Sequence, residues 1–270
     1  MLKKILKRIQ KKMLMPVLEK QYEFEMAVHD YYKDNELKLK YIINKLSLIN
    51  EIVELEDARF WVPNAPRDGV QNTLLSKCMF YEQEILEDLD KYLTQESVVL
   101  DIGANIGNHS VYWGKVTNVK KVFSFEPTDV IFKILEKNIE INNLTEKITI
   151  YNIGLGNKNT NGKIASFNIG NVGATGIKED ISGDITIKKL DDIEEIKSER
   201  IDFVKIDVEG FEKNILDGAI ETITKNRPIV FIESLPWDNN LDFVKNYFSE
   251  LGYNEPIGYP DHNFLFIHKQ

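Results

Sequence analysis

With 270 residues, the chain is longer than a single domain usually is, so we expect either one large domain with an appendage or two domains. Its content of 43% hydrophobic and 29% charged residues is typical of a soluble globular protein. The sequence has no apolar stretch of bilayer length, its start lacks the apolar segment of a signal peptide, and its single cysteine excludes an intramolecular disulfide. We therefore expect a cytoplasmic protein.

The net charge of −9 is unevenly distributed along the chain. Six of the 34 basic residues lie within residues 1–12, which contain no acidic residue, and the other 28 face 43 acidic residues in the rest of the sequence. Proteins bind nucleic acids through clustered lysine and arginine side chains. We therefore expect no nucleic-acid partner for the acidic body, although the basic N-terminus leaves that alternative open.

A helical N-terminal extension is expected over residues 1–56. Apolar residues recur there at intervals of three and four in two stretches, namely Leu2, Ile5, Ile9 and Met13, and Ile42, Leu46, Ile49 and Val53. The first stretch is basic between its apolar positions, as in helices that lie on an anionic surface such as the inner membrane or that dock on a partner helix. A solvated helix packed on its own body is the simpler interpretation. The second stretch suits self-association but is shorter than two heptads.

Residues 57–96 are expected to form a connector and a helix that packs on the domain after them. Prolines and a glycine make residues 57–73 irregular, and the helix is predicted from about Thr73 to Leu93. On that helix Glu82 shares a stripe with three leucines. Its carboxylate therefore lies on the face that is expected to be buried, where it needs a partner.

Residues 97–270 alternate short apolar strands with helices, which predicts an α/β domain with a mostly parallel sheet covered by helices on both faces. Strands are expected near 97–102, 121–126, 147–153, 202–207 and 228–233, and helices near 107–117, 129–141, 211–224 and 239–251. Residues 253–259 and 263–269 are expected to form a closing hairpin. Between 155 and 200 the alternation lapses into polar sequence with strand-like pieces at 163–168 and 184–188, so we expect an insertion that shapes the substrate site.

Two neighbouring strand ends carry the residues expected to bind a cofactor. The first strand ends in Asp101 and leads into a turn that contains Gly103 and Gly107, and the second ends in Glu126, followed by Pro127. Open parallel sheets bind ligands beyond the carboxyl ends of their strands, where the strand order reverses. The glycines allow a ligand to approach the backbone and the free N–H groups of the next helix, while Glu126 can accept hydrogen bonds from ribose hydroxyls.

A dinucleotide is the competing cofactor, because it also uses an acidic residue at the end of the second strand. Here the glycines are spaced Gly103-x-x-x-Gly107 and do not follow the pattern G-x-G-x-x-G, and Asp101 would face a pyrophosphate unfavourably. A carboxylate at this point suits a cationic amino group, and the helix N-terminus suits a carboxylate. Together they describe the methionyl end of S-adenosylmethionine.

Several segments resemble the FkbM-type methyltransferases, a branch of the class I methyltransferase fold. They are DIGANIGNH at 101–109, FEP at 125–127, IDFVKIDVEGFE at 201–212 and DGA at 217–219. The resemblance covers about residues 75–270 and does not extend to the first 55. It implies a Rossmann-like seven-stranded sheet with an antiparallel last strand, S-adenosylmethionine as methyl donor, and transfer to a hydroxyl oxygen, often on a sugar, glycan or natural product.

The resemblance also assigns cofactor residues by motif position. The residues expected around the methionine end are Asp101, Gly103, Ala104, Asn105, Gly107 and Asn108. Glu126, with Pro127 fixing the turn after it, is assigned to the ribose, and Asn152 at the end of the third strand to the adenine. The sequence departs from the family at residues 154–156, Gly-Leu-Gly, where the family more often has Ala-Leu.

Methyl transfer from a sulfonium to an alcohol requires alignment of donor and acceptor and a base that takes the hydroxyl proton as the bond forms. Asp207, at the end of the fourth strand, is the candidate base. Lys205 lies on the same strand face and is expected to be buried, so it needs a charge partner among Asp207, Glu209 and Glu233. The alternative is that Lys205 only stabilises the strand and Asp207 binds the cofactor or caps the next helix.

Two further residues are candidates for the chemical step. Glu233, at the end of the fifth strand, is expected to bind acceptor hydroxyls. His109 has the chemistry of a base, but in the first turn of a helix it can equally cap or pack. Because spacing ties no histidine or third carboxylate to Asp207 and Glu209, we predict no metal ion.

The resulting hypothesis is an S-adenosylmethionine-dependent O-methyltransferase that acts on a sugar, a glycan or a similar polyhydroxylated acceptor. Methylation of nucleic acid or protein is an alternative that the acidic body disfavours. A third possibility is a cofactor-binding scaffold in a glycan-synthesis complex, assembled through the N-terminal helices.

Overall fold

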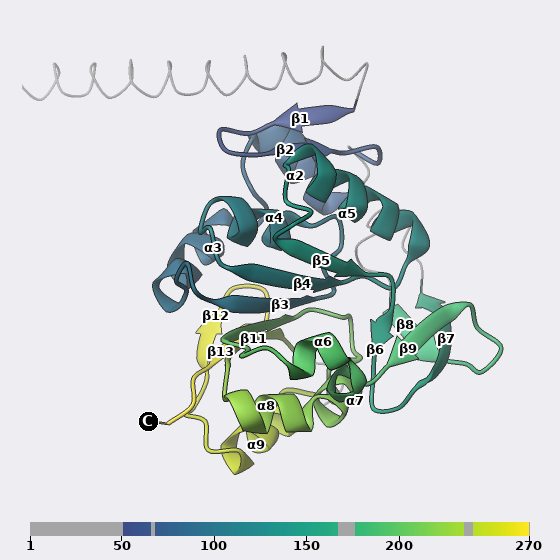
Figure 1. Cartoon of the computed structure of the whole chain (residues 1–270), viewed down its shortest axis with the longest axis vertical. Coiled ribbons are helices and arrows are strands. Elements are labelled where there is room, and N and C mark those ends of the chain that lie inside the picture. Colours follow the sequence, from purple (N-terminus) through teal and green to yellow (C-terminus); the bar gives the residue numbers. More distant parts are fainter. Residues whose placement is uncertain (1–50, 66–67, 167–175, 235–239, 270) are drawn as a thin grey trace, which may run out of the picture.

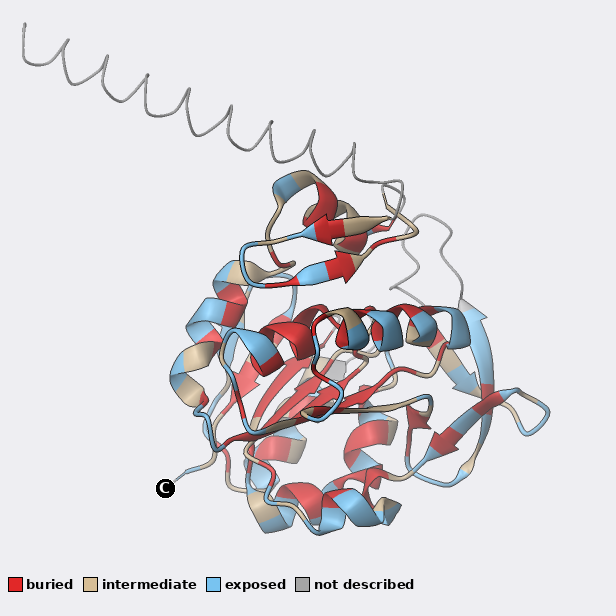
Figure 2. Ribbon diagram, turned by 45° about the horizontal axis from the view of Figure 1, so that its top comes forward, coloured by how far each residue is buried: buried red, intermediate tan, exposed pale blue. Residues whose placement is uncertain are grey.

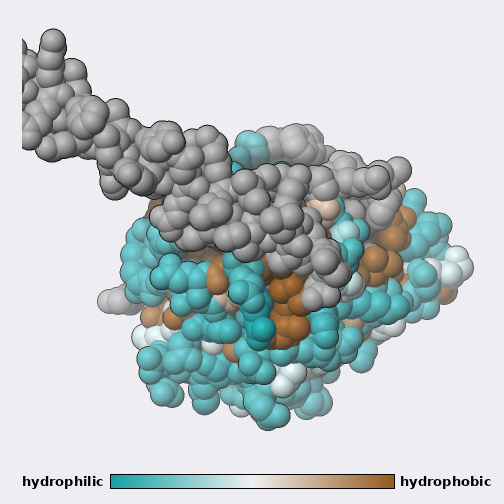
Figure 3. Space-filling model, turned by 90° about the horizontal axis from the view of Figure 1, so that it is seen from above, coloured by the Kyte–Doolittle hydropathy of each residue, from teal (hydrophilic) through white to brown (hydrophobic). Residues whose placement is uncertain are grey.

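The computed structural model describes residues 51–65, 68–166, 176–234 and 240–269. The helices expected within residues 1–50 lie outside this part of the chain. None of the helices in the described ranges is both long and apolar enough to cross a lipid bilayer. The described surface is mainly hydrophilic with a few apolar patches in the view of Figure 3.

The described chain is built on a seven-stranded sheet in the order β12-β13-β11-β10-β3-β4-β5 (Figure 1). The parallel strands are β3 (Val98–Ile102), β4 (Lys121–Phe125), β5 (Ile148–Tyr151), β10 (Phe203–Ile206) and β11 (Ile229–Glu233). β13 (Asn263–Phe266) runs antiparallel to β11, and β12 (Ile257–Tyr259) pairs antiparallel with β13. The predicted α/β fold and its antiparallel last strand are confirmed.

Helices cover both faces of this sheet (Figure 2). The side chains of each strand alternate between the two layers. One layer contains α4 (Asn108–Lys115) and α5 (Asp129–Ile141), and Val99 of β3 packs in its core. The other contains α6 (Glu194–Lys197), α7 (Glu212–Gly218), α8 (Ile220–Asn226) and α9 (Asn240–Glu250). Val98, Leu100 and Ile102 of β3 pack in that second core.

The segment before β3 differs from the prediction. Strands β1 (Ile52–Glu54) and β2 (Arg59–Trp61) form a hairpin, so Val53, expected in a helix, lies in a strand. The single helix expected over 73–93 is two helices, α2 (Gly69–Lys77) and α3 (Gln83–Leu89), with the 3-10 turn η1 (Asp90–Tyr92) after them. Cys78 and Glu82 bound the corner between the two helices with φ values of 54° and 56°. A right-handed helix cannot continue through left-handed residues, and hydrophobic periodicity does not report backbone φ.

Two asparagine side chains hold the β1–β2 hairpin on α5. Asn142 accepts the N–H of Arg59 at 3.0 Å and donates to the carbonyl of Arg59 at 2.6 Å. The buried Asn138 accepts the N–H of Trp61 at 2.7 Å and donates to the carbonyl of Ile106 at 2.8 Å. Asn138 therefore joins the hairpin, α5 and the turn that follows β3.

The expected insertion is a second sheet, with the order β6-β9-β7-β8 in the described residues. Its strands are β6 (Gly154–Leu155), β7 (Thr160–Ser166), β8 (Gly176–Glu179) and β9 (Ile185–Lys188). β7 and β9 correspond to the expected strand-like pieces, whereas β8 was not expected. Figure 1 shows this sheet on the right, next to the end of β5.

The helix predicted over 211–224 is divided into α7 and α8 at Ala219. The start of α8 is fixed by Asp191 of η2 (Leu190–Asp192), whose carboxylate accepts the N–H groups of Glu221 and Thr222, both at 2.9 Å. This cap comes from a distant part of the chain. The helical periodicity of the segment could not indicate it.

Candidate active site

A cavity of about 610 Å³ lies at the carboxyl ends of β3, β4 and β10. β3 is flanked by β4, the next main-sheet strand along the chain, and by β10, which comes much later, so the order of the sheet reverses here. Such a switch point is where open parallel sheets bind their ligands. The insertion contributes Ile177 of β8 to the wall.

The turn after β3 forms one side of the cavity. Gly103 has a φ of +79°, and a Cβ at this position would lie 1.8 Å from the carbonyl oxygen of Asp207, so only glycine fits between the two strand ends. Gly107 has a φ of +87°, and a Cβ there would lie 2.7 Å from the side chain of Leu135. Gly103 and Asn105 line the cavity, whereas Ala104 and Gly107 are not among the lining residues. The two glycines are thus required by the packing of the protein on itself.

Glu126, at the end of β4, lines the cavity together with Pro127. Its buried carboxylate accepts the N–H of Asn105 at 3.1 Å and that of Thr128 at 2.8 Å, which fixes its orientation. Burial raises the pKa of Glu126 to about 7, although these hydrogen bonds oppose the shift. Each carboxylate oxygen retains a second lone pair, so the ionised group can also accept the hydroxyls of a ribose.

Asp101 and Lys205 form a buried ion pair beside the cavity. They are partners in the register of β3 and β10, and the ammonium of Lys205 lies 3.4 Å from Asp101 Oδ1 and 3.3 Å from Asp207 Oδ2. The ammonium also donates to the carbonyl of Gly103 at 2.8 Å, and the other oxygen of Asp101 accepts the hydroxyl of Ser110 at 2.5 Å. Burial lowers the pKa of Lys205, but the charges of Asp207 and Asp101 outweigh it and raise this pKa above its ordinary value.

The predicted burial of Lys205 is confirmed, since the residue is 3% exposed, and of the three expected partners Asp207 is the one within ion-pair distance, joined by Asp101, which was not expected. Asp101 is 0% exposed, and neither it nor Lys205 is among the residues that line the cavity. The carboxylate of Asp101 faces Lys205 and Ser110. Its assigned contact with a methionyl amino group therefore stays a prediction.

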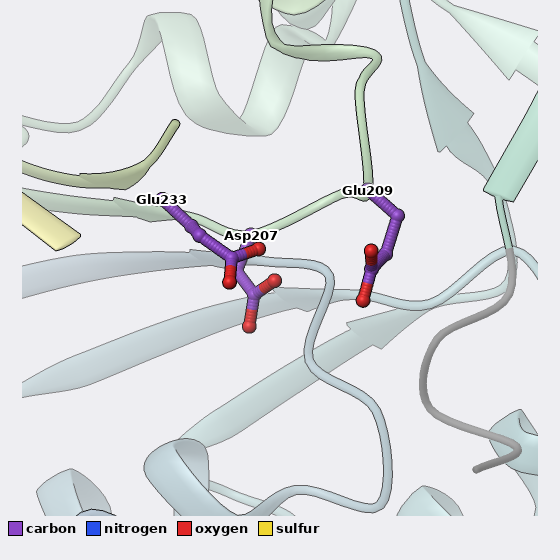
Figure 4. A group of neighbouring side chains, drawn as sticks. All are labelled: Asp207, Glu209 and Glu233. Carbon is purple, nitrogen blue, oxygen red and sulfur yellow. The ribbon is translucent and has the colours of Figure 1, made fainter. Parts of the chain in front are cut away.

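Three carboxylates, those of Asp207, Glu209 and Glu233, meet at the ends of β10 and β11 (Figure 4). One oxygen of each lies within 4.8 Å of the others. Burial, followed by the charge of Asp207, raises the pKa of Glu233 to about 9. Burial acts in the same direction on Asp207, but the charge of Lys205 and a hydrogen bond from Glu233 lower its pKa overall. At neutral pH Asp207 is therefore an ionised carboxylate, and Glu233 is a protonated carboxyl group.

Spacing could not tie the third carboxylate to this group, because Glu233 comes from a different strand. Carboxylate oxygens are ligands for divalent cations. In the described chain, however, Asp207 is paired with the ammonium of Lys205 and Glu233 is protonated at neutral pH. The absence of a metal ion stays a prediction.

The corner between α2 and α3 meets the start of α4. The side-chain amide of Asn108 accepts the N–H of Tyr81 and donates to the carbonyl of Tyr81, both at 2.9 Å. Next to it, Nε2 of His109 lies 3.3 Å from Oε2 of Glu82, and both side chains are largely buried. Glu82 thus has the partner that its expected burial required, although it lies at a corner and not on a helix. Since the amide of Asn108 binds Tyr81 and does not line the cavity, its assignment to the donor stays a prediction.

Tyr81 is a candidate site residue that the sequence analysis missed. Its side chain is half-buried, and burial raises the pKa of its hydroxyl to about 12, with further contributions from the negative charges of Glu82, Asp207, Asp261 and Glu233. The hydroxyl therefore lies within electrostatic range of the acidic groups around Asp207. Tyr81 belongs to no motif, and it reaches the site only because the helix breaks at the corner.

Asn152, assigned to the adenine, is exposed and donates a hydrogen bond to Asp129 at 2.5 Å. The residues that follow it, Ile153, Gly154 and Leu155, line the cavity, as do Ile177 and Phe211. Apolar walls of this kind suit the faces of an aromatic base. The residues after Asn152, and not Asn152 itself, therefore line the space expected for the adenine.

Comparison with known proteins decides the family. Residues 101–255 match the family model described as the methyltransferase FkbM domain. The chain belongs to the FkbM methyltransferase family. Membership of the FkbM family implies a methyltransferase domain that uses S-adenosylmethionine as its methyl donor.

Individual relatives are distant. The hexuronic acid methyltransferase AglP of Haloferax volcanii is 30% identical over 53% of this chain and 58% of its own length. The methyltransferase sdnD of Sordaria araneosa is 26% identical over 48% of this chain and 62% of its own length. The chain thus spans about three-fifths of the curated relatives it matches. A crystal structure of methyltransferase FkbM from Methylobacillus flagellatus is similar at 20% identity, with a TM-score of 0.49, over 74% of this chain and 52% of that one.

The described residues fit S-adenosylmethionine. Glu126 provides an oriented carboxylate for ribose hydroxyls, Ile153, Ile177 and Phe211 provide apolar surface for the base, and the turn at Gly103 exposes backbone for the methionine end. These groups line one continuous cavity at the switch point of the sheet.

Proposed function

We propose that the protein methylates a hydroxyl oxygen of a sugar, a glycan or a similar polyhydroxylated acceptor. The observation that carries the proposal is the carboxylate of Asp207, which lines the donor cavity and is held ionised beside the protonated Glu233. The similarity to a protein named as a hexuronic acid methyltransferase supports a sugar as acceptor.

On the donor side, the proposed roles follow the lining of the cavity. Glu126 accepts the ribose hydroxyls, and Gly103 and Asn105 face the methionine end. Ile153 and Phe211 enclose the adenine. Bound S-adenosylmethionine supplies an electrophilic methyl group on a sulfonium centre, so the task of the protein is to align an acceptor and to move one proton.

On the acceptor side, Asp207 holds the hydroxyl and takes its proton as the new C–O bond forms. Lys205 keeps Asp207 ionised and oriented, since its ammonium is fixed between Asp101, Asp207 and the carbonyl of Gly103. Glu233 donates a hydrogen bond to Asp207, which helps to keep Asp207 ionised.

Calorimetry with S-adenosylhomocysteine and a methyl-transfer screen against nucleotide-sugars and glycans test the proposal. Asp207→Asn should lower kcat by about 10²- to 10⁴-fold, the usual contribution of a general base, while the affinity for S-adenosylhomocysteine changes little. Asp242→Asn, which removes an exposed carboxylate on α9, is the matched control. Equal losses of affinity and turnover in Asp207→Asn would make Asp207 a donor ligand, and folded protein without affinity for S-adenosylhomocysteine would refute the donor assignment.

A further inference from the structure

The acceptor side of this site is surrounded by acidic groups. Asp207 lies with Glu209 and Glu233 at the strand ends, their oxygens within 4.8 Å of one another. After burial, the negative charges of Glu82, Asp207, Asp261 and Glu233 raise the pKa of the Tyr81 hydroxyl. Asp207 and Glu209 both line the donor cavity, and these charges therefore lie where the acceptor must meet the methyl group.

The basic groups of this region are already bound within the protein. Lys205 is 3% exposed, and its ammonium is held by Asp101, Asp207 and the carbonyl of Gly103. Nε2 of His109 faces the carboxylate of Glu82. In the described residues around Asp207, a cation is thus not available to an acidic ligand. The sequences that precede β8 and follow β11, at 167–175 and 235–239, contain no lysine or arginine.

An acceptor that carried its own carboxylate would bring a negative charge against Asp207 and Glu209. Like charges in contact are strongly disfavoured, and apart from the sulfonium of the donor no cation in the described part of the site would offset them. Hydroxyl and ammonium groups, in contrast, donate hydrogen bonds to carboxylates.

We infer that the sugar residue that receives the methyl group carries no negative charge: it is a neutral or amino-bearing sugar and not a sugar acid. The inference rests on the proposed methylation of a sugar hydroxyl at Asp207. It separates this chain from the relative whose name gives a hexuronic acid as its acceptor.

The test compares acceptors that differ only in charge. Methyl glycosides of a hexose, of the corresponding hexuronic acid and of the corresponding amino sugar, each in the gluco, galacto and manno configurations, are assayed with the full chain and S-adenosylmethionine. Within a configuration that is methylated, kcat/KM for the neutral or amino sugar should exceed that for the acid by at least about tenfold, as expected for like charges in contact. Raising the salt concentration should narrow this difference, because screening weakens repulsion but not a mismatch of shape.

Two variants test whether the acidic groups cause the preference for acceptors without a negative charge. Glu209→Gln should raise kcat/KM for the hexuronic acid relative to the hexose by about threefold or more, since it removes an exposed charge at the cavity. Glu146→Gln removes an exposed charge before β5, at the opposite end of the sheet, and should leave the ratio unchanged. An equal response of both variants would contradict the assignment.

The outcomes separate this inference from the proposed function. A protein that methylates hexuronic acids as well as or better than the neutral sugars overturns the inference and leaves sugar O-methylation intact. A protein that binds S-adenosylhomocysteine but methylates no sugar of any charge overturns the proposed function, and the inference fails with it. Transfer to neutral or amino sugars with a salt-sensitive exclusion of the acids supports both.

Discussion

Carboxyl groups at the site differ in their pKa values because their surroundings differ. Burial raises the pKa of Glu126 to about 7 and that of Glu233 to about 9, whereas Lys205 keeps the pKa of Asp207 low. One residue type thus provides the proposed ribose ligand, which titrates near neutrality, the proposed proton acceptor, which is ionised, and a neutral hydrogen-bond donor. Their charge states at neutral pH follow from packing and not from residue type.

The affinity for S-adenosylhomocysteine should rise between about pH 6 and pH 8, because ribose hydroxyls prefer the ionised carboxylate and Glu126 ionises near pH 7. Glu126→Gln should weaken binding by about 1 to 3 kcal/mol at pH 8 and remove most of this pH dependence. Calorimetry across that range measures both effects. Glu136→Gln, an exposed change on α5, is the control, and a persistent pH dependence in Glu126→Gln would place the titrating group elsewhere.

Replacement of Lys205 should affect both the fold and the chemical step. Lys205→Met leaves Asp101 buried without its cation, which should cost about 3 to 5 kcal/mol of unfolding free energy. It should also raise the pKa of Asp207 and shift the acidic limb of the pH–rate profile upward. If that variant does not fold, Lys205→Arg keeps the charge and should keep the limb in place while kcat falls. An unshifted limb in folded Lys205→Met would show that Lys205 has no electrostatic role; Lys133→Met on the exposed face of α5 is the control.

Elements of the parallel sheet were predictable because their side chains alternate in a strict pattern. The five parallel strands and the helices α4, α5 and α9 lie where apolar periodicity placed them. The corner at Cys78–Glu82 was not predictable, because it depends on two residues with positive φ and on contacts with α4 that come from a distant part of the chain. The division between α7 and α8 was not predictable for the same reason, because the start of α8 is capped by Asp191, which lies far away in the sequence.

Asn138 connects three elements, so its loss should destabilise the whole N-terminal layer. Asn138→Ala leaves the N–H of Trp61 and the carbonyl of Ile106 without partners in a buried place, which should cost about 1 to 3 kcal/mol of unfolding free energy. Denaturant unfolding measures the change. Lys137→Ala, on the exposed face of the same helix, should stay within about 0.5 kcal/mol, and similar losses in the two variants would deny Asn138 this role.

For the whole molecule, the raised pKa values predict lower stability at alkaline pH. Glu233 has a pKa of about 9 in the folded protein against an ordinary value of 4.5, so the fold favours its protonated form. Its contribution to stability is therefore complete below about pH 4.5 and is lost as the pH rises toward 9. Glu126 acts in the same direction up to about pH 7.

The melting temperature should accordingly be higher at pH 6 than at pH 8.5, and Glu233→Gln should reduce the difference. Thermal unfolding at constant ionic strength measures it. Glu250→Gln, at the exposed end of α9, is the control. The same pH dependence in native protein and Glu233→Gln would mean that Glu233 is not held protonated by the fold.

The donor half of the site was more predictable than the acceptor half. Gly103, Asn105, Glu126, Pro127 and Asp207 line the cavity because strand ends of a parallel sheet share one edge, and sequence places residues at strand ends. Asn108, Asn152 and Asp101 bind other protein groups, which a motif does not reveal. Tyr81 and the meeting of Glu233 with Asp207 depend on tertiary packing, so only the three-dimensional arrangement discloses them.

The contact of Gly103 with the carbonyl of Asp207 limits how such an enzyme can diversify. The backbone that receives the donor and the backbone that carries the proton acceptor touch, so neither can be rebuilt without displacing the other. The corner with Tyr81 and the exposed Glu209 carry no such restriction, because their side chains can change while that contact stays. New acceptor preferences, whether in evolution or in a designed library, should therefore arise at these peripheral side chains, with the shared backbone inherited unaltered.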